Sequence, residues 1–141
     1  MDQREKLPIE YALSQIEIFE FVGKLHNKEV VKYFNETGHE AITDDETAWC
    51  CAFVNWCLMK ADRDYSEKLN ARSYLTIGTE VKIPEVGDIV VLKRGTSSWQ
   101  GHVGFFCRED KRYIYVLGGN QGNKVCAKPY KKEDLLSYRR I

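Results

Sequence analysis

The sequence lacks a long apolar run, an excess of charge of either sign and a C-x-x-C pair. No apolar stretch approaches the ~20 residues that a membrane-spanning helix needs, so no membrane span is expected. Lysine plus arginine equal aspartate plus glutamate at 21 each, so no overall field favours nucleic acid or an anionic lipid surface. The first residues lead into an acidic amphipathic segment rather than a signal-peptide core. We therefore expect synthesis in the cytoplasm without a visible secretory signal.

The cysteines also limit the choice of fold. The chain has five cysteines, an odd number, and 141 residues can form a core without disulfide bonds, so a full disulfide framework is not expected. A zinc site built from scattered cysteine and histidine stays open as an alternative. A hydrophobic content of 43% and a charged content of 30% predict one soluble globular domain over residues 1–141.

The first half of the chain has the periodicity of helices. Apolar residues at a three-four spacing predict a first helix from Pro8 to Phe21. A second is predicted between an N-cap at Asn27 and a stop at Gly38. From Ala48 to Ala61 only Asn55 and Lys60 are clearly polar, which predicts a buried central helix.

After residue 84 the pattern changes to short apolar runs typical of strands. The predicted strands cover residues 88–92, 102–107, 113–117, 124–127 and 135–141. Because helices come first and strands second, the sequence predicts an α+β fold with a small antiparallel sheet.

The central helix begins with a thiol. Cys50 falls in its first turn if one of residues 45–47 provides the N-cap, and there the helix dipole lowers the pKa of a thiol. A nearby imidazolium lowers that pKa further. Cys51 is turned about 100° from Cys50 around the helix, so the two thiols cannot share one environment.

His102 lies between glycines at the start of a predicted strand. A three-residue hairpin loop would place it opposite Asn120, whose side-chain carbonyl can accept the imidazole N–H and so fix its tautomer. A two- or four-residue turn would make Gly119 the partner instead. The sequence leaves this register open.

The surroundings of these residues allow two interpretations. Glycines remove side chains near His102 and Asn120, which fits either a groove for a chain-like substrate or ordinary turns and bulges: Gly101, Gly104, Gly118 and Gly119. Trp49 and Trp99 lie beside Cys50 and His102 in the sequence. They could line such a groove, although core packing is expected for at least one of them.

Four segments follow one another in a specific order: DETAWCCAFVNW at 45–56, GDIVV at 87–91, GHVGF at 101–105 and LGGNQ at 117–121. This order resembles the CHAP group of cysteine- and histidine-dependent amidohydrolases and peptidases, which are related to NlpC-type hydrolases and papain-like folds. It looks most like the small phage-associated and bacterial members that cut peptidoglycan. The resemblance spans about residues 10 to 141.

The resemblance implies a papain-like α+β fold with the nucleophile at the start of a central helix packed on the sheet. It implies Cys50 as nucleophile, His102 as general base and Asn120 as orienting group, without a metal or cofactor. Cys51 stands where a small Ala, Ser or Thr is usual, which leaves open which thiol attacks, although the match places Cys50 first. The predicted substrate-binding residues are Trp49, Trp99, Gly101 and Gln121.

The implied activity is cleavage of an amide in the peptide stem of peptidoglycan, at the sugar–peptide link or within the peptide, through a thioester. The alternative is a non-catalytic interaction module that retains the fold. No cell-wall-binding domain is recognisable, so targeting has to come from the groove, a partner or the delivery route. We expect a monomer that acts at the cell wall or in the periplasm after delivery, with room for a delivery or immunity partner.

Overall fold

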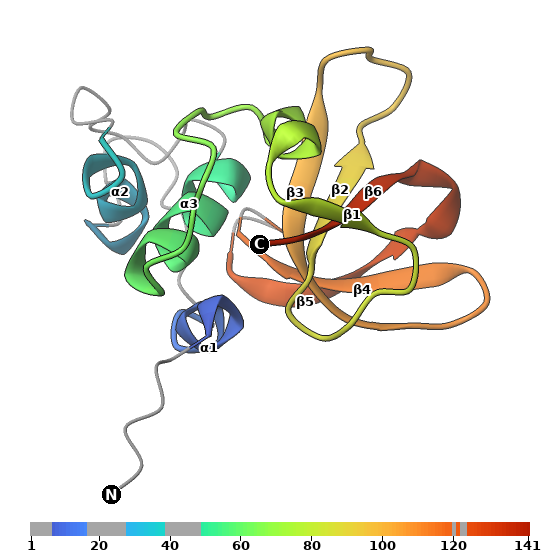
Figure 1. Cartoon of the computed structure of the whole chain (residues 1–141), viewed down its shortest axis with the longest axis horizontal. Coiled ribbons are helices and arrows are strands. Elements are labelled where there is room, and N and C mark those ends of the chain that lie inside the picture. The colour runs from blue at the N-terminus through green and yellow to red at the C-terminus, as the bar shows by residue number, and fades with distance from the viewer. Residues whose placement is uncertain (1–6, 17–27, 39–48, 120, 122–123) are drawn as a thin grey trace, which may run out of the picture.

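The structure, a computed structural model, describes residues 7–16, 28–38, 49–119, 121 and 124–141 (Figure 1). Within these ranges the helices are α1 (Pro8–Leu13), α2 (Lys28–Asn35) and α3 (Cys50–Lys60), with short 3-10 turns η1 (Ala71–Thr76) and η2 (Lys132–Asp134). The strands are β1 (Thr79–Val81), β2 (Ile89–Lys93), β3 (Gly101–Glu109), β4 (Tyr113–Gly118), β5 (Cys126–Lys131) and β6 (Leu135–Arg140). No helix in the described ranges is long and apolar enough to cross a membrane.

The strands form one antiparallel sheet in the order β1-β6-β2-β3-β4-β5, and the helices gather on one side of it (Figure 1). This confirms the predicted α+β class and antiparallel pairing. Each of the five predicted strands overlaps a strand of the structure, although β5 shares only residues 126–127 with the predicted 124–127. β1 was missed because its three residues alternate too briefly to form a pattern.

The helices agree with the sequence in position more than in extent. α1 covers Pro8–Leu13 and continues as turns to Ile16, and the rest of the predicted helix lies outside the described residues. α2 is followed by a turn at Gly38, whose φ of 94° requires the left-handed region that glycine tolerates. The predicted stop is therefore confirmed. The predicted cap at Asn27 lies outside the described residues.

α3 begins one residue after its N-cap, Trp49. The Phe53 amide donates to the Trp49 carbonyl at 2.9 Å, and the Trp49 side chain makes no capping hydrogen bond. The prediction that one of residues 45–47 is the N-cap was wrong. The placement of Cys50 in the first turn is confirmed.

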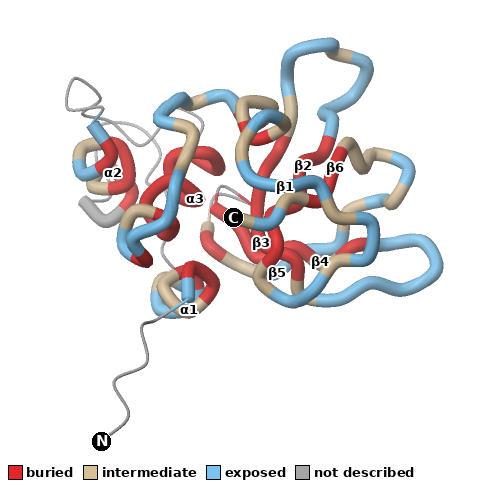
Figure 2. Tube along the Cα trace, viewed as in Figure 1, coloured by how far each residue is buried: buried red, intermediate tan, exposed pale blue. Residues whose placement is uncertain are grey.

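The main core lies between the helices and the sheet. Every residue of α3 from Cys50 to Leu58 is buried, which confirms the predicted central helix (Figure 2). α1 and α2 pack on α3, which in turn packs on β3 and β4. From the sheet, Ile89, Val91, Val103 and Phe105 join this core.

A second apolar cluster lies on the other face of the sheet. It consists of Val90, Leu92, Phe106, Ile114, Val116 and Tyr138. Successive residues of a strand point to opposite faces, so β2 supplies both cores and reads as a continuous apolar run. Figure 1 shows how the sheet curves, and this curvature lets the sheet cover its own second face.

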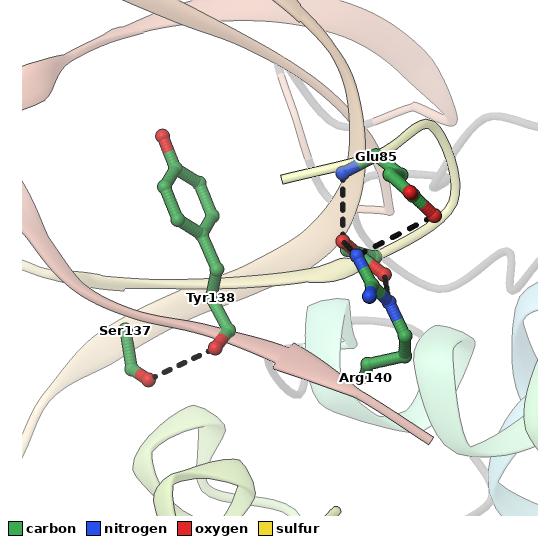
Figure 3. Close-up of polar contacts among 5 residues, drawn as sticks. Glu85, Ser137, Tyr138 and Arg140 are labelled. Carbon is green, nitrogen blue, oxygen red and sulfur yellow. Dashed lines mark hydrogen bonds and ion pairs between the residues drawn. The ribbon is translucent and has the colours of Figure 1, made fainter. Parts of the chain in front are cut away.

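An ion pair joins the start of β2 to the end of β6. The buried carboxylate of Asp88 accepts hydrogen bonds from Nε and Nη2 of Arg140 at 2.9 and 2.7 Å. It also accepts the backbone amide of Glu85 at 2.7 Å. Figure 3 shows Glu85 and Arg140 converging in this contact. The Asp88 carboxylate raises the pKa of the Arg140 guanidinium, which keeps the pair charged.

We predict that Asp88→Ala lowers the free energy of unfolding by about 2 kcal/mol, because the substitution removes the hydrogen bonds that the buried carboxylate accepts from Arg140 and Glu85. Urea-induced unfolding measures the change. Glu85→Gln is the matched control, since the Glu85 carboxylate meets Arg140 at 3.5 Å but is 76% exposed. A change in the control as large as that in Asp88→Ala would contradict the assignment of this stability to Asp88.

Candidate active site

Cys50 lies at the first position of α3, against β3, and only 5% of it is exposed. Hydrogen bonds from the backbone at Val103, Cys51 and Cys50 itself favour the thiolate, as the start of a helix should. Burial outweighs them, because a charged sulfur loses its hydration, and the pKa of the Cys50 thiol is raised. The expectation of a lowered thiol pKa was therefore wrong.

Cys51 points into a different environment, as predicted from the helical geometry. Its Sγ is 3.3 Å from the Lys68 carbonyl oxygen and 3.5 Å from that of Asn70, in the segment that leads to η1. Burial, and secondarily the neighbouring Cys50, raise the pKa of the Cys51 thiol to about 12. Cys51 is thus a hydrogen-bonded core residue.

The same segment is tied to α3 by Asn55, the polar residue in the middle of the apolar helix. Its Nδ2 donates to the Lys68 carbonyl at 2.8 Å, and its Oδ1 accepts from the Tyr74 hydroxyl. Asn55 and Tyr74 are both fully buried. This network positions η1 beside β3 and was not predicted, since the sequence gives no sign that positions 55, 68 and 74 meet.

His102 lies near the start of β3 and is 3% exposed. Its ring stacks on Tyr130 of β5 at a centroid distance of 4.9 Å. Its Nε2 lies 2.8 Å from Oε1 of Gln121, while its Nδ1 has no hydrogen-bond partner among the described residues. Cys50 lies near the same part of β3, because α3 packs on β3 and the backbone of Val103, the residue next to His102, favours the Cys50 thiolate.

Burial dominates the acid–base behaviour of His102. It lowers the pKa of the imidazole from 6.5 to about 4, and the hydrogen bond to Gln121 acts in the opposite direction. Arg94 and Lys128 lower this pKa further. Arg94 also favours the Cys50 thiolate. At neutral pH the site therefore holds a neutral imidazole and a neutral thiol.

The β3–β4 register near the site is the one that the three-residue loop predicted. Phe105 pairs with Leu117 and Phe106 with Val116. Closer to the turn, Glu109 pairs with Ile114, and a shift between positions 106 and 108 restores the predicted register. Asn120 lies outside the described residues, so its contact with His102 stays a prediction.

The glycines serve close packing rather than an open groove. A side-chain carbon at Gly118 would lie 2.6 Å from Oε1 of Gln121, and one at Gly119 would lie 2.7 Å from the Trp49 ring. One at Gly101 would lie 2.7 Å from the Leu92 carbonyl. Gly101 was predicted to contact substrate, but the space where its side chain would lie is taken up by the neighbouring chain.

The two tryptophans differ in burial, which agrees with the expectation that at least one of them packs in the core. Trp49 is fully buried and stacks on Tyr33 at 6.0 Å, so it does not present a surface to substrate. Trp99 is 68% exposed in the loop between β2 and β3. Arg72 holds this loop by donating to the carbonyls of Gln100 and Ser97, both at 2.7 Å.

Gln121 was expected to contact substrate, but it is 1% exposed and its side chain is used inside the protein. Direct contact with substrate does not fit this burial. The sequence did contain a signal for another role, since Gln121 directly follows the residue predicted to orient His102. Among the described residues, no group of three histidine, cysteine or acidic side chains could hold a metal ion.

The comparisons with known proteins agree with this geometry. The CHAP domain family matches residues 42–120, more than half of the chain, and the chain belongs to this family. The crystal structure of the P60 domain of an antigen from M. avium paratuberculosis has the same fold, with a TM-score of 0.55 and 12% sequence identity. The match covers 96% of this chain and 91% of that one. No curated protein matches the sequence significantly. The chain is thus a CHAP cysteine-peptidase-type domain with a papain-like fold.

We predict that burial of His102 makes stability depend on pH between about 6.5 and 4. The unfolded chain takes up a proton near pH 6.5, whereas the folded chain resists it until about pH 4. This contribution is complete above pH 6.5 and is lost as pH falls toward 4. Unfolding measured across this range should show a steeper loss in the wild-type protein than in His102→Asn. Parallel curves would contradict the lowered pKa.

Proposed function

We propose that the protein is a cysteine amidase or endopeptidase that cleaves an amide in the peptide stem of bacterial peptidoglycan. The observation that carries the proposal is the state of His102, which is buried, held at Nε2 and unpartnered at Nδ1 within the described structure. A buried imidazole nitrogen without a hydrogen-bond partner costs folding free energy, so its presence calls for an explanation such as a catalytic role. The start of α3, where Cys50 lies, packs on the residue next to His102.

Cys50 is the proposed nucleophile and His102 the proposed general base. Nδ1 of His102 takes the thiol proton as Sγ attacks the amide carbonyl carbon, and the imidazolium then protonates the leaving amine as the C–N bond breaks. Water, deprotonated by His102, hydrolyses the thioester. The backbone N–H of Cys50, at the start of α3, is one donor for the oxyanion.

The directions of the two pKa shifts define how this chemistry starts. Burial raises the pKa of Cys50 and lowers that of His102, so the resting pair carries no charge. Proton transfer is therefore coupled to attack on the carbonyl rather than completed beforehand. Arg94, exposed near the site, favours the thiolate and thus the negative charge that develops during attack.

Delivery and targeting belong to the same proposal. We propose that the enzyme acts as a monomer at the cell wall or in the periplasm after delivery. Peptidoglycan is its substrate, and a delivery or immunity protein is its partner.

Cys50→Ala should abolish release of fragments from purified peptidoglycan, while Cys51→Ala should keep most of the activity. The reason is that the Cys51 thiol is directed at the carbonyls of residues 68 and 70 rather than at His102. Mass spectrometry of the released muropeptides measures the activity and identifies the bond. Activity that survives Cys50→Ala, or is lost equally in both variants, contradicts the assignment of the nucleophile.

The alternative, a non-catalytic interaction module, predicts that the wild-type protein releases no fragments. Alkylation by iodoacetamide does not separate the two functions. Burial of Cys50 and its raised pKa slow alkylation in either case. The digest therefore decides between them.

Trp99 is the proposed substrate contact, because its exposed ring stands on a loop fixed by Arg72. Trp99→Ala should raise KM several-fold and leave kcat nearly unchanged, since a ring that only binds affects ground state and transition state alike. Steady-state kinetics on soluble muropeptides measure both constants. Tyr113→Ala is the matched control, because this exposed aromatic lies at the far end of β4. A fall in kcat alone in Trp99→Ala would refute a binding role.

A further inference from the structure

We propose that Gln121 is the positioning residue of the site, which holds His102 as the tautomer with the proton on Nε2 and the lone pair on Nδ1. The inference deepens the proposed function and rests on it for the use made of that lone pair. The tautomer itself follows from hydrogen bonds alone. Its evidence is the contact of 2.8 Å between Nε2 of His102 and Oε1 of Gln121.

The orientation of the Gln121 amide is fixed by its other partners. Its Nε2 lies 3.0 Å from the Val116 carbonyl oxygen and 2.5 Å from that of Cys126. Both are acceptors, so the atom that faces them has to be the NH2 group with its two donors. Turning the amide over would set its oxygen against two carbonyl oxygens. The atom facing His102 is therefore the oxygen.

The tautomer of His102 follows from that orientation. An amide oxygen only accepts, so Nε2 of His102 has to be the donor and carries the proton of the neutral ring. Nδ1 is then left with a lone pair. Because Nδ1 has no partner among the described residues, this lone pair is available to accept the thiol proton.

The protein fixes Gln121 itself from several sides. It is 1% exposed, its backbone amide donates to the Lys124 carbonyl at 3.0 Å, and its carbonyl accepts from the Cys126 thiol at 3.4 Å. Gly118 makes the approach possible, since a side chain there would lie 2.6 Å from Oε1. Tyr130 stacks on the His102 ring and restricts its rotation.

A neutral partner suits a base better than a charged one at this depth. A carboxylate in place of the amide would stabilise the imidazolium and raise the pKa of His102. It would also lack the N–H groups that bind the carbonyls of Val116 and Cys126. The glutamine thus sets the tautomer while the ring stays neutral, which keeps Nδ1 ready to accept a proton.

The test is 15N NMR of the 141-residue chain, in which the ring nitrogen shifts report the tautomer of each histidine. The chain has two other histidines, His26 and His39, as internal references, and His102→Asn assigns the third signal. The wild-type protein should show His102 with its proton on Nε2. Gln121→Met, which removes the acceptor at similar volume, should give a mixed tautomer and lower kcat at least about tenfold with little change in KM.

Two further variants make the result specific. Gln121→Glu restores an acceptor, so it should return the proton to Nε2 and raise the pKa of His102 above about 4. Gln15→Met is the matched control, because the Gln15 side chain accepts a hydrogen bond from Tyr33 on the helical side of the molecule. Its His102 signal should match that of the wild type. If Gln121→Met does not fold, the pKa in Gln121→Glu decides.

A wild-type proton on Nδ1, or an unchanged tautomer in Gln121→Met, would overturn the proposal, as would an unchanged His102 pKa in Gln121→Glu. A tautomer that changes in Asn120→Ala but not in Gln121→Met would assign the role to Asn120 instead. The tautomer is read without substrate, so the two proposals fail separately. An Nε2–H tautomer in a protein that cleaves no peptidoglycan refutes the proposed function and leaves the positioning role intact.

Discussion

The rest of the structure depends on the complete burial of α3. A helix that is apolar on all sides has to be covered on all sides, and here α1 and α2 cover one side while β3 and β4 cover the other. This packing leaves the helix little freedom to slide or rotate, because close-packed interiors resist small displacements. Its first residue is consequently held against the backbone of β3 beside His102. The Cys50 thiol is thus positioned mainly by the apolar packing of its helix.

Small residues complete this positioning at the end of β4. Gly119 lets the Trp49 ring, at the cap of α3, pack on the β4 end, and Gly118 lets Gln121 reach His102. These two glycines therefore help to connect the helix of Cys50 to the strand of His102. From the sequence alone, these glycines were equally compatible with a substrate groove. A missing side chain does not reveal whether a ligand or the protein fills the space. Packing around the glycine is decided by residues distant in the chain.

Periodicity and spacing were enough to predict the α+β class, the buried central helix, the separation of Cys50 from Cys51 and the strand that carries His102. These are local properties, since hydrophobic period and helical rotation act over a few residues. The cap of α3, the partner of His102 and the balance of effects on the Cys50 pKa were not predictable. Each depends on contacts between distant segments, such as Gln121 with Cys126 and Asn55 with Lys68. The register near His102 came out as one predicted alternative, although a bulge rather than the expected turn produces it.

Burial explains why the site combines a neutral imidazole, His102, with a neutral hydrogen-bond partner, Gln121. Removing water from Cys50 and His102 penalises both the thiolate and the imidazolium. Burial therefore raises the pKa of Cys50 and lowers that of His102, the opposite of what a resting ion pair needs. In the proposed mechanism, charge develops only when a carbonyl carbon is present to accept the sulfur, and the N–H groups at the start of α3 then stabilise that charge. A carboxylate beside His102 would favour the imidazolium before substrate arrives. An amide that is itself held by two backbone carbonyls fixes the ring without that effect, so the same burial that makes the pair neutral makes glutamine a suitable residue to orient it.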